Sequence, residues 1–188
     1  MPTPDSIKLA FSTNAYTRFP LIDAIRDIAA VGYSGVEILA DVPHAYPDSI
    51  DAALEKSVRD VLDETGITPD VNQIELNPYS ARKDSREYHA AHGIVTESYS
   101  PLGASGAELT KDPVITAIAN DHGRSPAQVV LRWHIQLGLV AIPRSSNAGR
   151  IAENINIFDF ELTEQEMSRI SALDRGDSAV TDSDVFGH

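Results

Sequence analysis

The stretch with the clearest chemical potential is AIPRSSNAGRIAEN, residues 141–154. A short apolar run is followed by Arg144, Ser145 and Ser146, and then by residues spaced as in a helix. A helix that begins near Asn147 presents backbone N–H groups without intrahelical partners, and the serine hydroxyls and the guanidinium add donors and a fixed positive charge. Donors and positive charge at one corner favour a phosphate ligand.

Three polar residues continue this segment one helical turn later. Arg150, Glu153 and Asn154 stand three and four positions apart, so all three can face one ligand. The segment also fits an alternative without a ligand, in which the serines cap the helix and Arg150 pairs with Glu153 on a solvated surface. The residues alone leave both interpretations open.

These residues need elements to position them, and the sequence predicts a repeated strand-helix unit. Apolar runs typical of short strands, each followed by helical spacing, cover residues 7–12, 35–40, 70–76, 93–100 and 138–143. Strands that alternate with helices predict an α/β fold with about five parallel strands and helices outside. Ligands bind such sheets at the carboxyl ends of the strands, and segment 141–154 lies at one of them.

Capping residues predict the helix boundaries. Pro20 precedes one helical stripe, and Ser49 is the expected N-cap of a helix that stops at Gly66. Further starts are predicted at Asp112-Pro113, Ser125-Pro126 and Thr163 to Glu166. Trp133 lies on the apolar face of its helix, so we expect it in the core.

Composition excludes several classes of function. The chain has 28 acidic and 15 Lys or Arg residues, a net charge of −13, which argues against nucleic acid as a partner. The lack of cysteine excludes disulfides and thiolate chemistry, and no signal-peptide pattern or run of about 18 apolar residues occurs. We expect a cytoplasmic protein without a membrane partner. A metal site is not expected, because no metal-ligand spacing involves His89, His92, His122 or His134.

Five stretches of the chain resemble the aldo-keto reductases, in that family's order: VNQIELNPY, GIVTESYSPLG, SPAQVVLRW, AIPRSSNAGRIAEN and IFDFELTEQEM. The resemblance covers residues 70–188. It implies an oxidoreductase with a (β/α)8 barrel that reduces aldehydes and ketones with NADPH, so that a small carbonyl compound is the expected substrate. A full barrel needs at least about 200 residues, so we expect an incomplete, TIM-barrel-like fold here.

The same resemblance implies cofactor roles. Gln73 would bond the nicotinamide carboxamide, Tyr99 would stack on the nicotinamide ring, and Ser100 and Leu102 would line the pyrophosphate. The 2′-phosphate would be held by Arg144, Ser145, Ser146, Asn147 and Arg150, and adenine would contact Glu153 and Asn154. For Gln73 and Tyr99, ordinary packing is the alternative.

Arg144 stands where the family commonly has Lys. The substitution keeps the charge and adds a planar fork of donors, so the resemblance still implies a preference for NADPH over NADH.

Catalytic residues are not assigned by the resemblance. The family uses an Asp, a Tyr, a Lys and a His from strands that precede the matched part, and residues 1–69 offer no recognisable counterparts. We therefore expect an NADPH-dependent reductase with impaired catalysis. The alternative is a barrel fragment that binds NADPH without chemistry.

Residues 1–69 resemble a different barrel family, the xylose-isomerase-like sugar phosphate isomerases and epimerases, through IKLAFSTNAY and GYSGVEILAD. A sugar phosphate isomerase or epimerase is thus a third hypothesis. Glu37, Asp41 and His44 would then be a vestigial metal cluster, although a solvated loop is the expected state. Asp41 and Tyr46 also have the spacing of the reductase Asp and Tyr, but a tyrosine without its lysine keeps a pKa near 10.

The chain thus resembles a join of two incomplete barrels near Val71-Asn72, either a natural fusion or an engineered chimera. We expect its parts, 1–69 and 70–188, to form one continuous domain. Five parallel strands do not close a barrel of the usual kind, so open sheet edges remain. We expect the open edges to be covered by formation of a homo-oligomer, or the chain to form an open sheet with helices on both faces.

Overall fold

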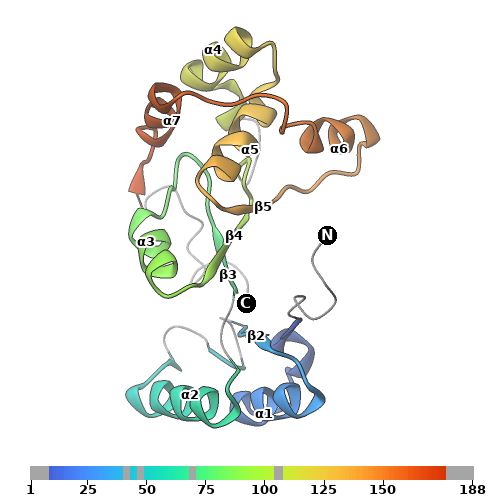
Figure 1. The fold of residues 1–188 in the computed structure, drawn as a ribbon, viewed down its shortest axis with the longest axis vertical. Helices are drawn as coiled ribbons and strands as arrows, with labels where there is room; N and C mark the ends of the chain where they lie inside the picture. Colours follow the sequence, from blue (N-terminus) through green and yellow to red (C-terminus); the bar gives the residue numbers. More distant parts are fainter. Residues whose placement is uncertain (1–8, 40–42, 46–48, 68–70, 104–107, 177–188) are drawn as a thin grey trace. The chain divides into compact units, whose positions relative to one another are not determined.

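The computed structural model describes residues 9–39, 43–45, 49–67, 71–103 and 108–176. The chain divides into two compact units, Met1–Asn72 and Gln73–His188, close to the predicted division between residues 69 and 70 (Figure 1). Each unit has a hydrophobic core of its own. That both parts form one continuous domain stays a prediction.

The first unit is a strand-helix-strand repeat followed by another helix. It contains β1 (Ala10–Ser12), η2 (Thr13–Tyr16), α1 (Leu21–Val31), β2 (Gly35–Glu37) and α2 (Ala52–Thr65). β1 and β2 pair in parallel. The core forms because α1 presents an apolar stripe at helical spacing to β2 and α2, and this stripe contains Leu21, Ile25 and Ile28.

The second unit contains a three-stranded sheet. Its strand order is β3 (Val71–Glu75, of which Gln73 to Glu75 belong to this unit), β4 (Val95–Tyr99) and β5 (Val140–Ile142). Its helices are α3 (Lys83–Ala91), η4 (Leu109–Lys111), α4 (Pro113–His122), α5 (Pro126–Gln136), α6 (Ala148–Ile155) and α7 (Glu164–Ser171). α7 lies to one side of α5 and α6 to the other (Figure 1).

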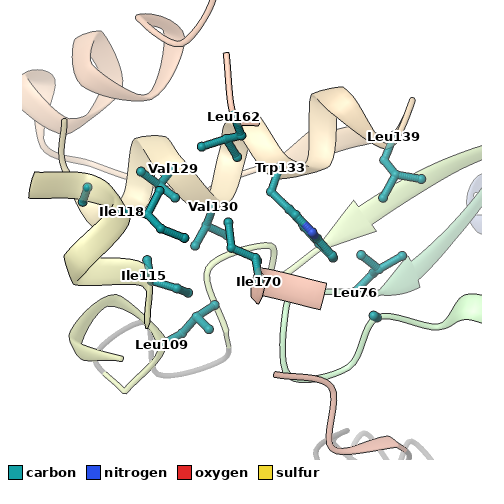
Figure 2. Close-up of a cluster of buried hydrophobic side chains, with 12 residues drawn as sticks. Leu76, Leu109, Ile115, Ile118, Val129, Val130, Trp133, Leu139, Leu162 and Ile170 are labelled. Atoms are coloured by element: carbon teal, nitrogen blue, oxygen red, sulfur yellow. The ribbon is translucent and has the colours of Figure 1, made fainter. Parts of the chain in front are cut away.

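Trp133 on α5 belongs to the core of the second unit. Its side chain is fully buried, in one cluster with Leu76 of the β3 loop, Ile118 of α4 and Ile170 of α7 (Figure 2). The indole N–H donates to Ser171 Oγ at 3.0 Å, which adds a polar link between α5 and α7. The prediction of a core role for Trp133 is confirmed.

Capping side chains start most helices where the sequence predicts. Asp112, Ser125 and Thr163 accept backbone N–H groups at the starts of α4, α5 and α7, and the latter two form capping boxes. Gly66 ends α2 with a φ of 67°, a left-handed conformation that suits glycine.

The predicted N-cap Ser49 is wrong. α2 begins at Ala52, and its N-cap is Asp51, whose Oδ1 accepts the N–H of Leu54 at 2.7 Å. A carboxylate can accept this bond and also carries the negative charge that a helix N-terminus favours. Ile50 therefore lies outside the helix and is exposed.

The predicted α/β fold with five strands is confirmed, but the described residues form two sheets rather than one. Local apolar patterns locate strands without specifying which strands pair. Among the described helices, none combines the length and the apolar character that crossing a membrane requires.

Candidate functional site

The loop that leaves β5 turns into α6 as the sequence predicts. Asn147 is the N-cap, and its Oδ1 accepts the N–H of Arg150 at 3.1 Å. Ser145 Oγ accepts the N–H of Asn147 at 3.1 Å, so this hydroxyl shapes the turn before the helix. Ser146 is exposed beside them. The cap of α6 is thus an asparagine rather than a serine.

Two guanidinium groups are exposed at the corner between β5 and α6. Arg144 and Arg150 are exposed, and neither forms an ion pair with a carboxylate of the described residues. The alternative in which Arg150 pairs with Glu153 is therefore wrong. Unpaired cations beside a helix N-terminus are an arrangement that binds phosphate, because the charges and the helix dipole act on the same anion.

An apolar groove of about 310 Å³ lies between α5, β5 and α6. Its lining contains two of the predicted cofactor residues, Ser145 and Asn154, which are also its polar side chains. The remaining lining is Leu131, Ile135, Ala141, Pro143, Ile151, Ile155, Ile157 and Phe158. Apolar walls with a few polar groups are typical of sites for flat, partly polar ligands.

A second group of predicted residues lies on β3 and β4. Tyr99 is the last residue of β4 and is 40% exposed. The Gln73 side-chain amide donates to Glu97 Oε2 at 3.1 Å, on the neighbouring strand. β4 and β5 run parallel with Tyr99 opposite Ile142, so the carboxyl ends of both strands lie at the same end of the sheet. The residues that follow β5 and those that follow β4 therefore lie at this same end of the sheet.

The surroundings of Tyr99 disfavour ionisation of its phenol. Burial raises the pKa of Tyr99, the nearby Glu75 carboxylate raises it further, and Arg82 acts in the opposite direction. A phenol with a raised pKa is a weak proton donor, although its ring can still stack on a flat ligand.

The loop after β4 contains a strained residue. Ser100 has a φ of 48°, in the left-handed region that non-glycine residues seldom adopt, and its carbonyl accepts the N–H of Gly103 at 2.8 Å. The side chain of Leu102 packs against the core of the second unit. Leu102 can therefore offer a ligand its backbone rather than its side chain.

The candidates of the first unit do not form a metal site in the described structure. His44 is buried with Nε2 at 3.0 Å from the carbonyl oxygen of Phe19, whereas Asp41 and Tyr46 lie outside the described residues. Over the described part of both units, no cluster of three His, Asp or Glu side chains could hold a metal ion.

The histidines of the second unit have structural contacts. His134 is fully buried between the carbonyl oxygens of Val130 and Leu76, and burial lowers its pKa. His89 lies 2.9 Å from Thr96 Oγ1.

Sequence reasoning missed a polar row on α5. Gln128, Arg132 and Gln136 repeat every four residues and hydrogen-bond to the segment between α6 and α7. Two of them, Gln128 and Arg132, are buried. The available signal was long polar side chains at this spacing among the apolar residues of one helix.

Residues 48–175 match the Aldo/keto reductase family. An aldo-keto reductase of Mycolicibacterium smegmatis is 53% identical over 116 residues, which are 62% of this chain and 42% of that protein. Methylglyoxal reductase DkgA of Escherichia coli (strain K12) is 44% identical over 127 residues, 68% of this chain and 46% of that protein. The chain thus spans less than half the length of these curated relatives.

Solved structures show the same likeness. A mutant of Gox0644 in complex with NADPH superposes with a TM-score of 0.69 at 33% identity, over 89% of this chain and 57% of that one. MGS-M4, an aldo-keto reductase from a deep-sea metagenome, is similar in fold, with a TM-score of 0.68 at 20% identity over 100% of this chain and 79% of that one. The family match begins at residue 48, inside the segment that resembles the isomerases, and none of these similarities supports that second resemblance.

Proposed function

The chain belongs to the aldo/keto reductase family, and from that premise we propose that its second unit binds NADPH. The observation that carries the proposal is the pair of exposed arginines at the corner between β5 and α6. Arg144 and Arg150 stand exposed beside the N-terminus of α6, without carboxylate partners among the described residues, in a chain with a net charge of −13. Two free cations on an acidic protein favour an anionic ligand there.

The proposed orientation follows from the position of the carboxyl ends of β4 and β5 at the same end of the sheet. The 2′-phosphate lies at Arg144, Ser146 and Arg150, and adenine lies by Ser145 and Asn154, which line the groove. The nicotinamide end lies toward Tyr99 and Gln73 on the neighbouring strands. When bound, NADPH supplies a hydride. Tyr99 offers its ring as a stacking surface, and its neutral phenol does not repel the cofactor.

Calorimetric titration of the whole chain with NADPH and NADH tests this proposal. We expect NADPH to bind about tenfold or more tightly than NADH, because charge-assisted hydrogen bonds to the extra phosphate contribute about 1.5–3 kcal/mol. Equal affinities would reject the assignment of the corner to the 2′-phosphate, and no heat with either nucleotide would reject the cofactor itself.

We further propose that these 188 residues on their own reduce aldehydes and ketones slowly or not at all. The candidate phenol at the site, Tyr99, has a raised pKa and is therefore a poor proton donor. NADPH consumption with an aromatic aldehyde, measured by loss of absorbance, is expected to match a blank without protein. Rapid turnover would show that the chain contains a working proton donor.

A further inference from the structure

Gln128 links α5 to the helix that carries the candidate phosphate site. Its side chain is buried, and its Nε2 donates to the carbonyl oxygens of Glu153 at 3.2 Å and Asn156 at 2.8 Å. Its Oε1 accepts the N–H of Ser125 at 3.1 Å, as part of the capping box of α5. One amide thus serves the start of α5 and the end of α6. The last carbonyl groups of a helix lack the usual intrahelical donors. The carbonyl oxygen of Glu153 accepts the N–H of Asn156 at 3.1 Å, and Gln128 adds a donor to it and to the carbonyl oxygen of Asn156.

Apolar packing of its own residues contributes little to holding α6 in place. α6 buries none of its residues, and its apolar side chains Ile151 and Ile155 are 54% and 71% exposed. Most helices in proteins are fixed by an apolar face packed on the core. Because α6 lacks such a face in contact, its attachment to α5 depends on hydrogen bonds at its C-terminal end. Two of these come from Gln128, and Arg132 Nη1 adds a third to the carbonyl oxygen of Ile157, just beyond the helix, at 3.2 Å.

We propose that Gln128 is a positioning residue for nucleotide binding, which acts by holding α6 where Arg150 and Asn154 meet the ligand. The inference rests on the proposed NADPH function. Gln128 itself lies outside the groove and its lining. Its effect passes through the backbone of Glu153 and Asn156, and a freed α6 moves Arg150 away from the other donors of the corner. Displacements of about 1 Å in positioning groups are known to have large effects.

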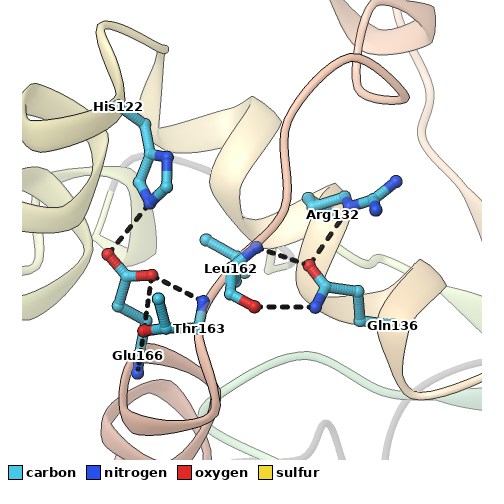
Figure 3. A network of polar contacts seen from close by, with 6 residues as sticks. All are labelled: His122, Arg132, Gln136, Leu162, Thr163 and Glu166. Carbon is cyan, nitrogen blue, oxygen red and sulfur yellow. Dashed lines mark hydrogen bonds and ion pairs between the residues drawn. The ribbon is translucent and has the colours of Figure 1, made fainter.

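Gln136 provides a matched control. It lies two helical turns further along α5, and its amide likewise accepts a backbone N–H through Oε1 and donates to a backbone carbonyl through Nε2. Its Oε1 accepts the N–H of Leu162 at 2.7 Å, and its Nε2 donates to the carbonyl oxygen of Leu162 at 2.9 Å (Figure 3). Leu162 lies beyond α6. Replacing either glutamine by glutamate keeps the acceptor and removes the donors, so the two variants differ in whether α6 loses its tether.

Hydrogen exchange measured by mass spectrometry tests the tether without any ligand. In Gln128→Glu, the amides of residues 148–155 are expected to exchange about tenfold faster than in the unmodified chain, because two hydrogen bonds of the helix end are lost. In Gln136→Glu, these amides keep their rates. Unchanged exchange of α6 in Gln128→Glu would overturn the proposal. The glutamate retains an acceptor for the N–H of Ser125 at the start of α5.

The ratio of NADPH to NADH affinity tests the functional step. Gln128→Glu is expected to lower this ratio about tenfold, whereas Gln136→Glu leaves it unchanged, although both variants are destabilised. A normal ratio in Gln128→Glu would reject the positioning role. If the unmodified chain binds neither nucleotide, the proposed function fails and the positioning role fails with it, whereas the exchange rates still decide whether Gln128 tethers α6.

Discussion

At the scale of single residues, Arg150 combines two roles. Its backbone N–H is held by the Asn147 cap, and its guanidinium remains exposed. The backbone bond fixes where the side chain starts, and the absence of an ion pair with the described carboxylates leaves the charge available. Arg150 is therefore the single side chain on which we expect phosphate affinity to depend most.

Arg150→Ala is expected to weaken NADPH binding by about 10- to 100-fold, because a charge-assisted hydrogen bond contributes about 1.5–3 kcal/mol. NADH binding should change little, because NADH lacks the 2′-phosphate. Calorimetry with both nucleotides measures the difference. Arg169→Ala, which removes an exposed arginine from α7, is the control. Equal losses for NADPH and NADH in Arg150→Ala would contradict the assignment.

Single residues also show the limit of sequence prediction. Asn147 was predictable as the beginning of α6 because it contacts its own helix three residues later. Gln128 was not, because its partners Glu153 and Asn156 lie 25 and 28 residues away and only the folded chain brings them together. Local contacts of this kind follow from spacing, whereas tertiary hydrogen bonds depend on helix placement.

At the scale of elements, α7 is joined to α4 by one carboxylate. Glu166 Oε1 accepts a hydrogen bond from His122 Nε2 at 2.9 Å, and Oε2 accepts from the N–H and hydroxyl of Thr163 at 2.7 and 2.9 Å (Figure 3). Burial alone raises the pKa of Glu166, but these hydrogen bonds together outweigh burial and hold it below the ordinary 4.5.

This lowered pKa predicts a dependence of stability on pH. Glu166 stabilises the fold above its ordinary pKa of 4.5, and this contribution is lost as the pH falls through the lower, folded-state value. Glu166→Gln should lose about 1 kcal/mol at neutral pH and show a flatter decline in acid. Urea unfolding at a series of pH values measures both. Parallel curves for the two proteins would contradict the role of this carboxylate.

The core around α4 and α5 predicts a second stability difference. Ile118 on α4 is fully buried, so Ile118→Ala should reduce the free energy of unfolding by about 2–5 kcal/mol through lost burial and a cavity. Ile155→Ala on α6 is the matched control, because the same change at an exposed site should cost less than about 0.5 kcal/mol. Urea unfolding followed by Trp133 emission reports on this core. Similar losses for both variants would argue against the described packing.

Helix starts were the elements that the sequence predicted best. Asp112, Ser125 and Thr163 each combine a side-chain acceptor with helical spacing immediately after it, which is local information. Ser49 failed because Asp51, a competing cap two residues later, is equally visible in the sequence. Strand positions followed from apolar runs, but their division into two sheets did not.

At the scale of the whole molecule, β5 forms one edge of its sheet in the described residues. Its side chains Val140 and Ile142 are exposed although they are apolar. Exposed apolar edge strands are templates for pairing with another chain. We propose that a second copy of this chain pairs with this edge, which gives the homo-oligomer expected from the sequence.

Ile142→Lys tests this proposal, because an edge lysine opposes strand pairing. Sedimentation should show the unmodified chain as an oligomer and the variant shifted toward the monomer. Phe158→Lys, at another exposed apolar site beyond α6, is the control and should leave the oligomer intact. A monomer in the unmodified chain would refute the proposal, and an oligomer unaffected by Ile142→Lys would move the interface elsewhere.

The polar row on α5 also limits how the length of this helix can vary. Gln128, Arg132 and Gln136 meet backbone carbonyls of Asn156, Ile157 and Leu162 in the same order as they occur along the helix. One residue inserted after Gln128 rotates the side chains of Arg132 and Gln136 by about 100° around the helix axis, away from the segment between α6 and α7 to which they bond. Insertions and deletions should therefore accumulate in homologous chains before Ser125 or after Gly138, and not between them.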